Sequence, residues 1–240
     1  MRDQFRSRTG SFVLLFALSA LPLAAQPRCA PVPPNLTAWF TFDEPEFRPL
    51  RVPGRVGSAA RFNGKDQFRE IPTTTPGLAV GDDDFTIELW LRTTDSVNTP
   101  SLVDKRDYTP LGYLVFLYKG HPGFQVSASG AVDNLIAQSP SIADGRWHHV
   151  AGVVRRLPPQ RFWLYVDGVK DPKGSAHPAP LVNLDVPAPL WLGRHHANKK
   201  MQTDDIYFKG DLDEVSFYHR ALTAAEIQSI FRAGSAGKCR

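Results

Sequence analysis

Two neighbouring segments rich in aromatic and β-branched residues constrain the fold of this 240-residue chain more than any other feature. Residues 147–154 and 161–167 each have the length of a strand, and turn-forming residues precede, separate and follow them. The turn residues are Asp144-Gly145, Leu157-Pro158-Pro159-Gln160 and Asp167-Gly168. This pattern is typical of a strand–turn–strand unit. Its density of apolar residues places the predicted pair in the middle of a sheet.

Short segments of the same kind follow one another along most of the chain. Residues 84–94 alternate most clearly, which predicts a core face of Phe85, Ile87, Leu89 and Leu91 and a second face of Thr86, Glu88, Trp90 and Arg92. Other strands are expected at 36–42, 101–105, 112–118, 123–128, 134–138, 190–192 and 209–218, with a hairpin of 58–63 and 67–71 around Gly64 and a loop at 45–57. Strands at this spacing predict an all-β sandwich.

One helix is expected near the C-terminal end, over residues 222–232. Thr223 is suited to be its N-cap, and Glu226, three residues on, completes a capping box. Gly234 can end the helix in the left-handed conformation. Ile227, Ile230 and Phe231 would then face the core, and the helix would close one end of the sandwich.

Residues 1–25 have the features of a secretory signal peptide. Arg2, Arg6 and Arg8 precede an apolar run from Phe12 to Leu23, and small residues follow at Ala24-Ala25. The run is too short to span a membrane, and no later segment approaches the length that a span needs. We therefore expect residues 26–240 to form one domain of a secreted protein, extracellular or, in a Gram-negative source, periplasmic.

Charge and cysteine content narrow the function further. The chain has 28 basic and 24 acidic residues, and without residues 1–25 it has 25 and 23, so its net charge is small. This balance, with no basic stripe in the sequence, argues against a nucleic-acid partner. Cys29 and Cys239 are the only cysteines. In an exported protein such a pair predicts a disulfide, which would require the two ends of the domain to lie side by side.

Short motifs spread from residue 39 to residue 227 resemble those of the laminin-G-like jelly rolls in the concanavalin A-like lectin/glucanase superfamily. They are Trp39-Phe-Thr-Phe-Asp43, Ala59-Ala-Arg-Phe-Asn-Gly64, Phe85-Thr-Ile-Glu-Leu-Trp90, Asp144-Gly-Arg-Trp-His-His-Val-Ala151, Leu164-Tyr-Val-Asp-Gly168, Leu192-Gly-Arg194, Gly210-Asp-Leu-Asp-Glu-Val215 and Arg220-Ala-Leu-Thr-Ala-Ala-Glu-Ile227. The resemblance implies a two-sheet antiparallel jelly-roll sandwich with one concave sheet and adjacent chain ends, which suits a Cys29–Cys239 bridge. It also implies binding of glycans or other extracellular ligands, and in many members a calcium ion near the rim.

The resemblance points to Asp43 and Asp213 as calcium ligands. Asn63 and nearby backbone carbonyls could complete the six to eight oxygens that Ca²⁺ takes. The run Asp82-Asp83-Asp84 is an alternative cluster, although successive acids usually form a solvated turn. Asp213 could instead cap local backbone groups.

Candidate ligand-binding residues lie mostly in two loops. Arg106 and Tyr108 belong to 104–109, and His195, His196 and Asn198 to 194–205. Loops at the rim of such a scaffold commonly carry recognition, although a merely solvated loop is an equal alternative. Aromatic rings can stack on sugars but are more often core residues. Tyr108 is the aromatic residue least expected in the core, and Trp90 is expected under a covering loop or along a groove.

Catalysis is not favoured by the sequence. A glucanase needs two carboxylates at one glycosidic bond, but Glu88 is the only acid inside its strand. Glu214 is expected to share a face with Leu212, opposite Asp213, and the neighbours His148 and His149 to point to opposite faces, one between the sheets and one outward.

The sequence therefore predicts a non-catalytic module that binds a glycan. The alternatives are a glucanase-type hydrolase that uses Glu88 and an adhesion module with an extracellular protein partner. The oligomeric state is left open.

Overall fold

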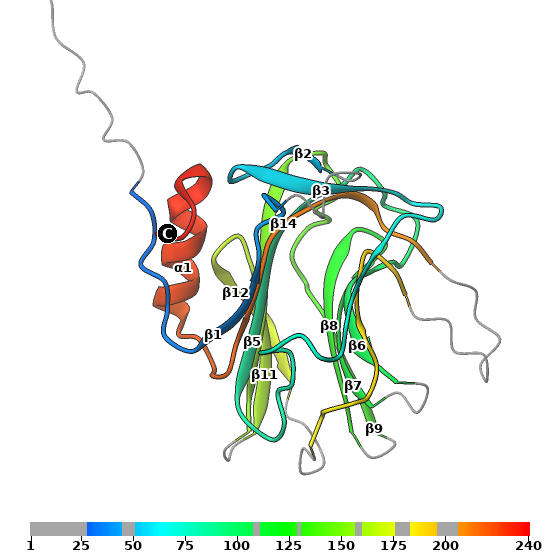
Figure 1. Cartoon of the computed structure of the whole chain (residues 1–240), viewed down its shortest axis with the longest axis vertical. Helices are drawn as coiled ribbons and strands as arrows, with labels where there is room; N and C mark the ends of the chain where they lie inside the picture. Colours follow the sequence, from blue (N-terminus) through cyan, green and yellow to red (C-terminus); the bar gives the residue numbers. More distant parts are fainter. Residues whose placement is uncertain are drawn as a thin grey trace, which may run out of the picture.

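The computed structural model describes residues 28–44, 51–107, 111–128, 131–156, 160–175, 183–195 and 206–240. These residues form two antiparallel sheets and a helix, arranged as three layers (Figure 1). The predicted all-β sandwich with a short C-terminal helix is confirmed. The signal-peptide prediction falls on residues 1–25, outside the described residues. Among the described residues, no helix is long and apolar enough to cross a membrane.

The first sheet has eight strands. Their order is β12 (Val169–Ser175), β11 (Arg161–Val166), β10 (Trp147–Arg155), β5 (Phe85–Arg92), β14 (Lys209–Tyr218), β3 (Ser58–Asn63) and β2 (Arg51–Pro53), and β1 (Leu36–Phe40) also pairs with β14. The predicted hairpin of β10 and β11 is confirmed, with continuous pairing from Val150–Val166 to Arg155–Arg161. β10 also pairs with β5, so the hairpin lies inside the sheet as expected.

One edge of β14 accommodates two strands end to end. Residues Lys209 to Leu212 pair with β3, and Val215 to Tyr218 pair with β1. At the junction the register against β5 shifts, and Glu214 takes a φ of 55°. This β-bulge re-aims the side chain of Glu214. Glu214 therefore contacts Lys238 on the outer face while Leu212 is in the core, and the prediction that the two share a face is wrong.

The second sheet has six strands. Their order is β4 (Arg69–Ile71), β13 (Leu190–Leu192), β6 (Ser101–Arg106), β7 (Gly112–Tyr118), β8 (His121–Ala128) and β9 (Ala131–Ile136). The hairpin expected around Gly64 is wrong, because β3 pairs with β14 and β2 whereas β4 pairs with β13 in the other sheet. β2 occupies a segment expected to be loop, since a three-residue edge strand with a proline shows no alternation.

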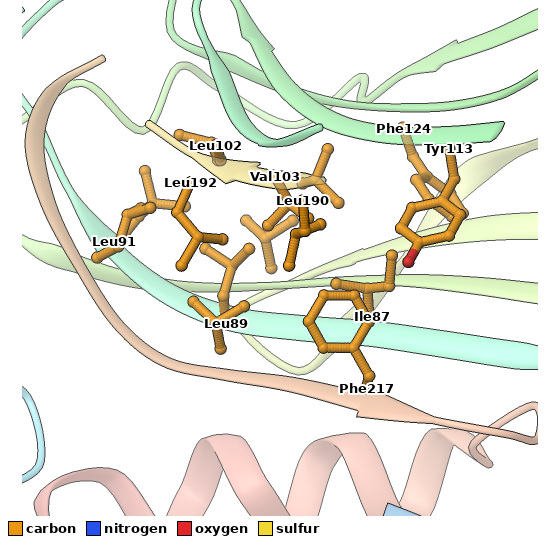
Figure 2. Close-up of a cluster of buried hydrophobic side chains, with 14 of the residues drawn as sticks. Ile87, Leu89, Leu91, Leu102, Val103, Tyr113, Phe124, Leu190, Leu192 and Phe217 are labelled. Carbon is orange, nitrogen blue, oxygen red and sulfur yellow. The ribbon is translucent and has the colours of Figure 1, made fainter. Parts of the chain in front are cut away.

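The main core fills the space between the two sheets. Ile87, Leu89 and Leu91 of β5 face apolar residues of the six-stranded sheet (Figure 2). The opposing residues labelled in the figure are Leu102, Val103, Tyr113, Phe124, Leu190 and Leu192. The four predicted core positions of β5 all belong to this core, which confirms the inward face. Full burial of each such side chain stabilises the fold by about 1.5–3 kcal/mol.

Helix α1 (Ala224–Ala233) forms a second, smaller core on the outer face of the eight-stranded sheet (Figure 1). Its buried residues Ile227 and Ile230 pack with Ala151, Val153 and Tyr165 of β10 and β11. The helix therefore covers a sheet face rather than closing an end of the sandwich. Local sequence could not reveal this, because a helix's apolar stripe does not specify the surface that receives it.

The two ends of the described chain are joined. Cys29 and Cys239 form a disulfide with a Cα–Cα distance of 4.9 Å, which confirms the predicted bridge. Beside it, the backbone N–H of Ala30 donates to Gly237 and that of Cys239 donates to Ala30, both at 2.8 Å. This pairing draws the C-terminal segment across the outer face of the eight-stranded sheet.

Candidate binding site

Outward-facing side chains of β7, β8 and β9 line a groove of about 310 Å³ on the six-stranded sheet. Tyr113, Val115 and Leu117 of β7 belong to the core, so alternation turns their neighbours outward. The residues that line this groove, called here the sheet groove, are Thr99, Leu114, Phe116, Tyr118, Gln125, Asn134, Ile136 and His195. Its surface therefore combines aromatic and aliphatic groups with two amides and an imidazole.

Two aromatic rings belong to the sheet groove. Tyr118 is 43% exposed, which leaves its ring accessible to a ligand. Phe116 is 7% exposed and lies against Gly123, its paired residue on β8, where a Cβ atom would clash with the ring. The missing side chain of Gly123 thus allows the Phe116 ring to lie along the sheet.

A hydrogen-bonded polar cluster on β6 contacts two lining residues of the sheet groove, Gln125 and His195. Asp104, fully buried, accepts hydrogen bonds from Nε and Nη2 of Arg106 at 2.8 and 2.7 Å. Nη1 of Arg106 donates to Oε1 of Gln125 at 3.4 Å. Nη2 of Arg106 also lies 3.3 Å from Nδ1 of His195. The structure thus brings together two predicted ligand residues, Arg106 and His195, and connects them to Gln125, which has no distinguishing signal in the sequence.

The polar cluster contains a serine, a histidine and an aspartate, but they are not arranged as a catalytic relay. Oγ of Ser101 and Oδ2 of Asp104 lie 3.0 and 3.8 Å from the same atom, Nδ1 of His195. In a relay the nucleophile and the acid use different imidazole nitrogens. Ser101 is also fully buried, so this cluster holds side chains in position.

The other predicted ligand residues are placed differently. Trp90 is 2% exposed; Phe231 stacks on its ring at 5.7 Å, and the Arg55 guanidinium lies 4.9 Å from its centroid. Its rings are therefore covered by helix α1 and Arg55, and it provides no stacking platform for a sugar. Tyr108, His196 and Asn198 lie outside the described residues.

Glu88 is buried on the outer face of the eight-stranded sheet, beneath the C-terminal segment. It accepts hydrogen bonds from Nζ of Lys238 at 2.8 Å and from the Tyr218 hydroxyl at 3.3 Å, and it lies 3.0 Å from Nε2 of His149. Burial raises the pKa of Glu88, but the charge of Lys238 and the hydrogen bond with His149 outweigh it and lower the pKa to about 2. A buried carboxylate that stays ionised is unsuited to donate a proton to a substrate.

The two adjacent histidines have separate environments, as predicted, but not the predicted ones. His149 is fully buried on the outer face, with its ring 5.2 Å from that of Trp90. It does not pack between the sheets, because the C-terminal segment and helix α1 create a second buried layer there. His148 lies at the rim, where Nδ1 is 2.8 Å from Asp167 and Nε2 is 3.0 Å from Asp144. The hydrogen bond with Asp167 raises the pKa of His148.

Asp43 and Asp213 lie against one turn, at the point where β1 and β3 meet beside β14. Asp43 accepts a hydrogen bond from the backbone N–H of Ser58, and Asp213 accepts one from that of Val56, both at 2.9 Å. Oδ1 of Asp213 is buried and has no hydrogen-bond partner among the described residues, and burial raises the pKa of Asp213 to about 8. Two carboxylates, one with an unsatisfied oxygen, beside backbone carbonyls fit the oxygen ligands of Ca²⁺.

Asn63 is not part of this arrangement. It stands at the opposite end of β3 from Ser58, about 17 Å away at strand spacing. Its Oδ1 accepts hydrogen bonds from the backbone N–H groups of residues 65, 66 and 67. Nη1 of Arg240 also pairs with Asp43 at 2.7 Å. Among the described residues no group of three or more His, Cys, Asp or Glu side chains is arranged for a metal, so further ligands would be carbonyls and water.

The two-sheet sandwich, with the sheet groove on the outer face of its six-stranded sheet, has a lectin-like binding-domain fold. A family model for the concanavalin A-like lectin/glucanases superfamily, Laminin_G_3, matches residues 63–228. The chain belongs to this family. No curated protein sequence matches the chain.

Solved structures share the fold at low sequence identity. The binding domain of Paraclostridial Mosquitocidal Protein 1 has a TM-score of 0.59 and 19% identity, over 75% of this chain and 44% of that one. A second similar structure is domain 4 of AbnA, a GH43 extracellular arabinanase from Geobacillus stearothermophilus, in complex with arabinotriose. It has a TM-score of 0.52 and 22% identity, over 74% of this chain and 78% of that one. The crystal structure of the HCR/D F1240A mutant has a TM-score of 0.57 and 9% identity, over 81% of this chain and 46% of that one. The chain thus spans less than half of the first of these proteins.

Proposed function

We propose that this protein is an exported, non-catalytic glycan-binding module whose ligand occupies the sheet groove. One observation carries the proposal: the exposed Tyr118 ring lines the same groove as polar side chains that a hydrogen-bonded cluster already holds in position. A sugar offers an apolar ring face and several hydroxyl groups, so it needs both kinds of contact. The volume of about 310 Å³ lies at the lower end of the range for ligand pockets.

The comparison with domain 4 of AbnA supports this proposal, since that structure is a complex with arabinotriose. Because one fold hosts many functions, the chemistry of the groove carries more weight than the likeness. The disulfide supports export, because disulfides persist in oxidising compartments.

The hydrolase alternative is disfavoured by the surroundings of Glu88, the acid that the sequence made its best candidate. Glu88 has no exposed surface, and its oxygens are engaged by Lys238, Tyr218 and His149. A general acid must reach the glycosidic oxygen and hold a proton near the working pH.

A glycan array followed by calorimetric titration with the best ligand tests the proposal. We expect Tyr118→Ala to weaken binding about fivefold, since one ring contact is worth about 1 kcal/mol. Gln125→Ala should weaken it as well. The matched control is Val169→Ala, at a residue that is 67% exposed on edge strand β12 of the other sheet. A blank array would reject the glycan and favour an extracellular protein partner.

We further propose that Asp43 and Asp213 hold a structural calcium ion. The unsatisfied Oδ1 of Asp213 supports this proposal, as does the turn that both carboxylates touch. After chelation, added Ca²⁺ should raise the melting temperature, because saturation to 100 times Kd stabilises by about 2.7 kcal/mol. Asp213→Asn should abolish the rise, whereas Asp83→Asn, in the alternative acidic cluster, should keep it. An equal rise in melting temperature for the unchanged protein and both variants would show that Asp213 is not a calcium ligand.

A further inference from the structure

A second groove, with different chemistry, lies on the outer face of the eight-stranded sheet. It consists of two hollows of about 630 and 580 Å³ that share Arg92 and Gly145 as lining residues. Five cationic side chains line them, and they define what we call the basic groove: Arg55, Arg61, Arg92, Arg146 and Lys209. Of the lining residues that the structure describes, two carry carboxylates, Asp167 and Asp211. The groove therefore has an excess of positive charge, although the whole chain is nearly neutral.

A buried carboxylate holds two of the guanidinium groups in place. Asp211 is 2% exposed and accepts from Nε and Nη2 of Arg61 at 2.7 and 3.1 Å. It also accepts from Nε and Nη2 of Arg92 at 2.8 and 2.6 Å. A guanidinium has five N–H donors, and among the described residues no acceptor takes the two N–H groups of Nη1 in either arginine, which leaves them for a ligand. Both guanidinium groups are held in position before any ligand binds, which reduces the conformational entropy lost on binding.

Two other contacts in the basic groove are between arginine side chains and tryptophan rings. The Arg92 guanidinium lies 4.7 Å from the centroid of Trp147, a lining residue of the second hollow. Arg55 lies over the covered ring of Trp90 and has a buried Nε with no hydrogen-bond partner. At the edge, the Arg146 side chain is 80% exposed and pairs with Asp144. The cations thus range from partly covered to largely exposed, around two connected hollows.

We propose that the basic groove binds an anionic polysaccharide through its carboxylate or sulfate groups. The planar fork of arginine matches such oxyanions with two parallel hydrogen bonds. A duplex nucleic acid instead calls for cations along an extended basic surface, whereas these five are gathered around two connected hollows. This inference does not rest on the sheet groove, since the two grooves lie on opposite sheets.

Binding of the disulfide-intact protein to immobilised polygalacturonate, dextran sulfate and neutral dextran tests the inference. The double variant Arg61→Gln/Lys209→Gln removes two cations while Arg92 continues to neutralise Asp211. We expect it to lose at least about tenfold in affinity for one of the two anionic polymers. Lys170→Gln/Lys173→Gln, the same charge change at exposed positions of β12, is the matched control and should bind as the unchanged protein does. Raising the ionic strength should weaken the binding.

Three results would overturn the inference. One is the absence of binding to either anionic polymer at low ionic strength. A second is an equal loss in the two double variants, which would mean that net charge alone attracts the polymer. The third is tighter binding of duplex DNA or anionic vesicles than of the polysaccharides. Tyr118→Ala should keep its affinity for the anionic polymer, so a failure of this proposal can be told from a failure of the glycan proposal.

Discussion

At the scale of single residues, Lys238 determines how the outer face of the eight-stranded sheet is organised. It is 3% exposed and pairs with Glu88 at 2.8 Å and with Glu214 at 3.2 Å. Both carboxylates are themselves at most 1% exposed. Their attraction to the ammonium group offsets a desolvation cost that each charge would otherwise bear alone.

Replacement of Lys238 by methionine tests this balance. We expect Lys238→Met to lower the free energy of unfolding by about 3–5 kcal/mol, because it leaves two buried carboxylates without their shared cation. Urea unfolding measures the loss. Lys173→Met, at an exposed position, is the control and should change stability by no more than about 0.5 kcal/mol. A loss below about 1 kcal/mol for Lys238→Met would show that the network adds little.

At the scale of elements, the capping box of helix α1 depends on an ionised glutamate. Glu226 accepts from the backbone N–H of Thr223 at 2.8 Å and pairs with Arg220 at 2.5 Å. The hydrogen bond from Arg220 is the main reason that the pKa of Glu226 falls to about 2. This first turn positions the helix, which in turn covers Trp90 and the second core.

The capping box therefore predicts a pH dependence of stability. The pKa of Glu226 is lower in the folded state than its ordinary value of 4.5, so its contribution is complete above about pH 4.5 and is lost as the pH falls towards 2. The difference in unfolding free energy between the unchanged protein and Glu226→Gln should shrink over that range. Thr223→Ala should cost about 1 kcal/mol at neutral pH. A difference that is constant from pH 7 to pH 3 would contradict the role of the charge.

At the scale of the whole molecule, each sheet has its own outer surface. The six-stranded sheet presents the sheet groove, and the eight-stranded sheet presents helix α1, the C-terminal segment and the basic groove. The Cys29–Cys239 bridge spans 210 residues and holds the C-terminal segment over Glu88. In the chain-entropy description, closing a loop of that length stabilises the fold by about 5 kcal/mol. Two accessible faces would allow one module to contact two different ligands.

The local sequence pattern was sufficient to predict those structural features that depend on residues close together in the chain. The alternation of 84–94 identified its core face, the segments 147–154 and 161–167 identified their hairpin, and Thr223 with Glu226 identified the start of the helix. These features depend on side-chain periodicity and hydrogen bonds over a few residues, which the order of residues specifies directly. The disulfide was predictable for a different reason, since only two cysteines exist.

The candidate sites were less predictable, because their residues come from distant segments. Arg106 and His195 were selected, but Phe116, Gln125 and Asn134 were not, since in the sequence they read as ordinary strand residues. Trp90 alternated with core residues and so looked available, whereas helix α1 covers it. The bulge at Glu214 moved one acid to the other face, and no local signal in the sequence marks it.

The sequence by itself determined the class of fold, the core face of β5, the capped helix and the disulfide. Only the tertiary structure decided where the helix packs, which acids are buried, and that five cations scattered from Arg55 to Lys209 meet in one groove. The physical reason is that alternation and capping are local properties of a backbone, whereas burial and electrostatic environment depend on which segments become neighbours in space. In the basic groove, for example, the pairing of β3 and β5 with β14 places Arg61 and Arg92 opposite Asp211.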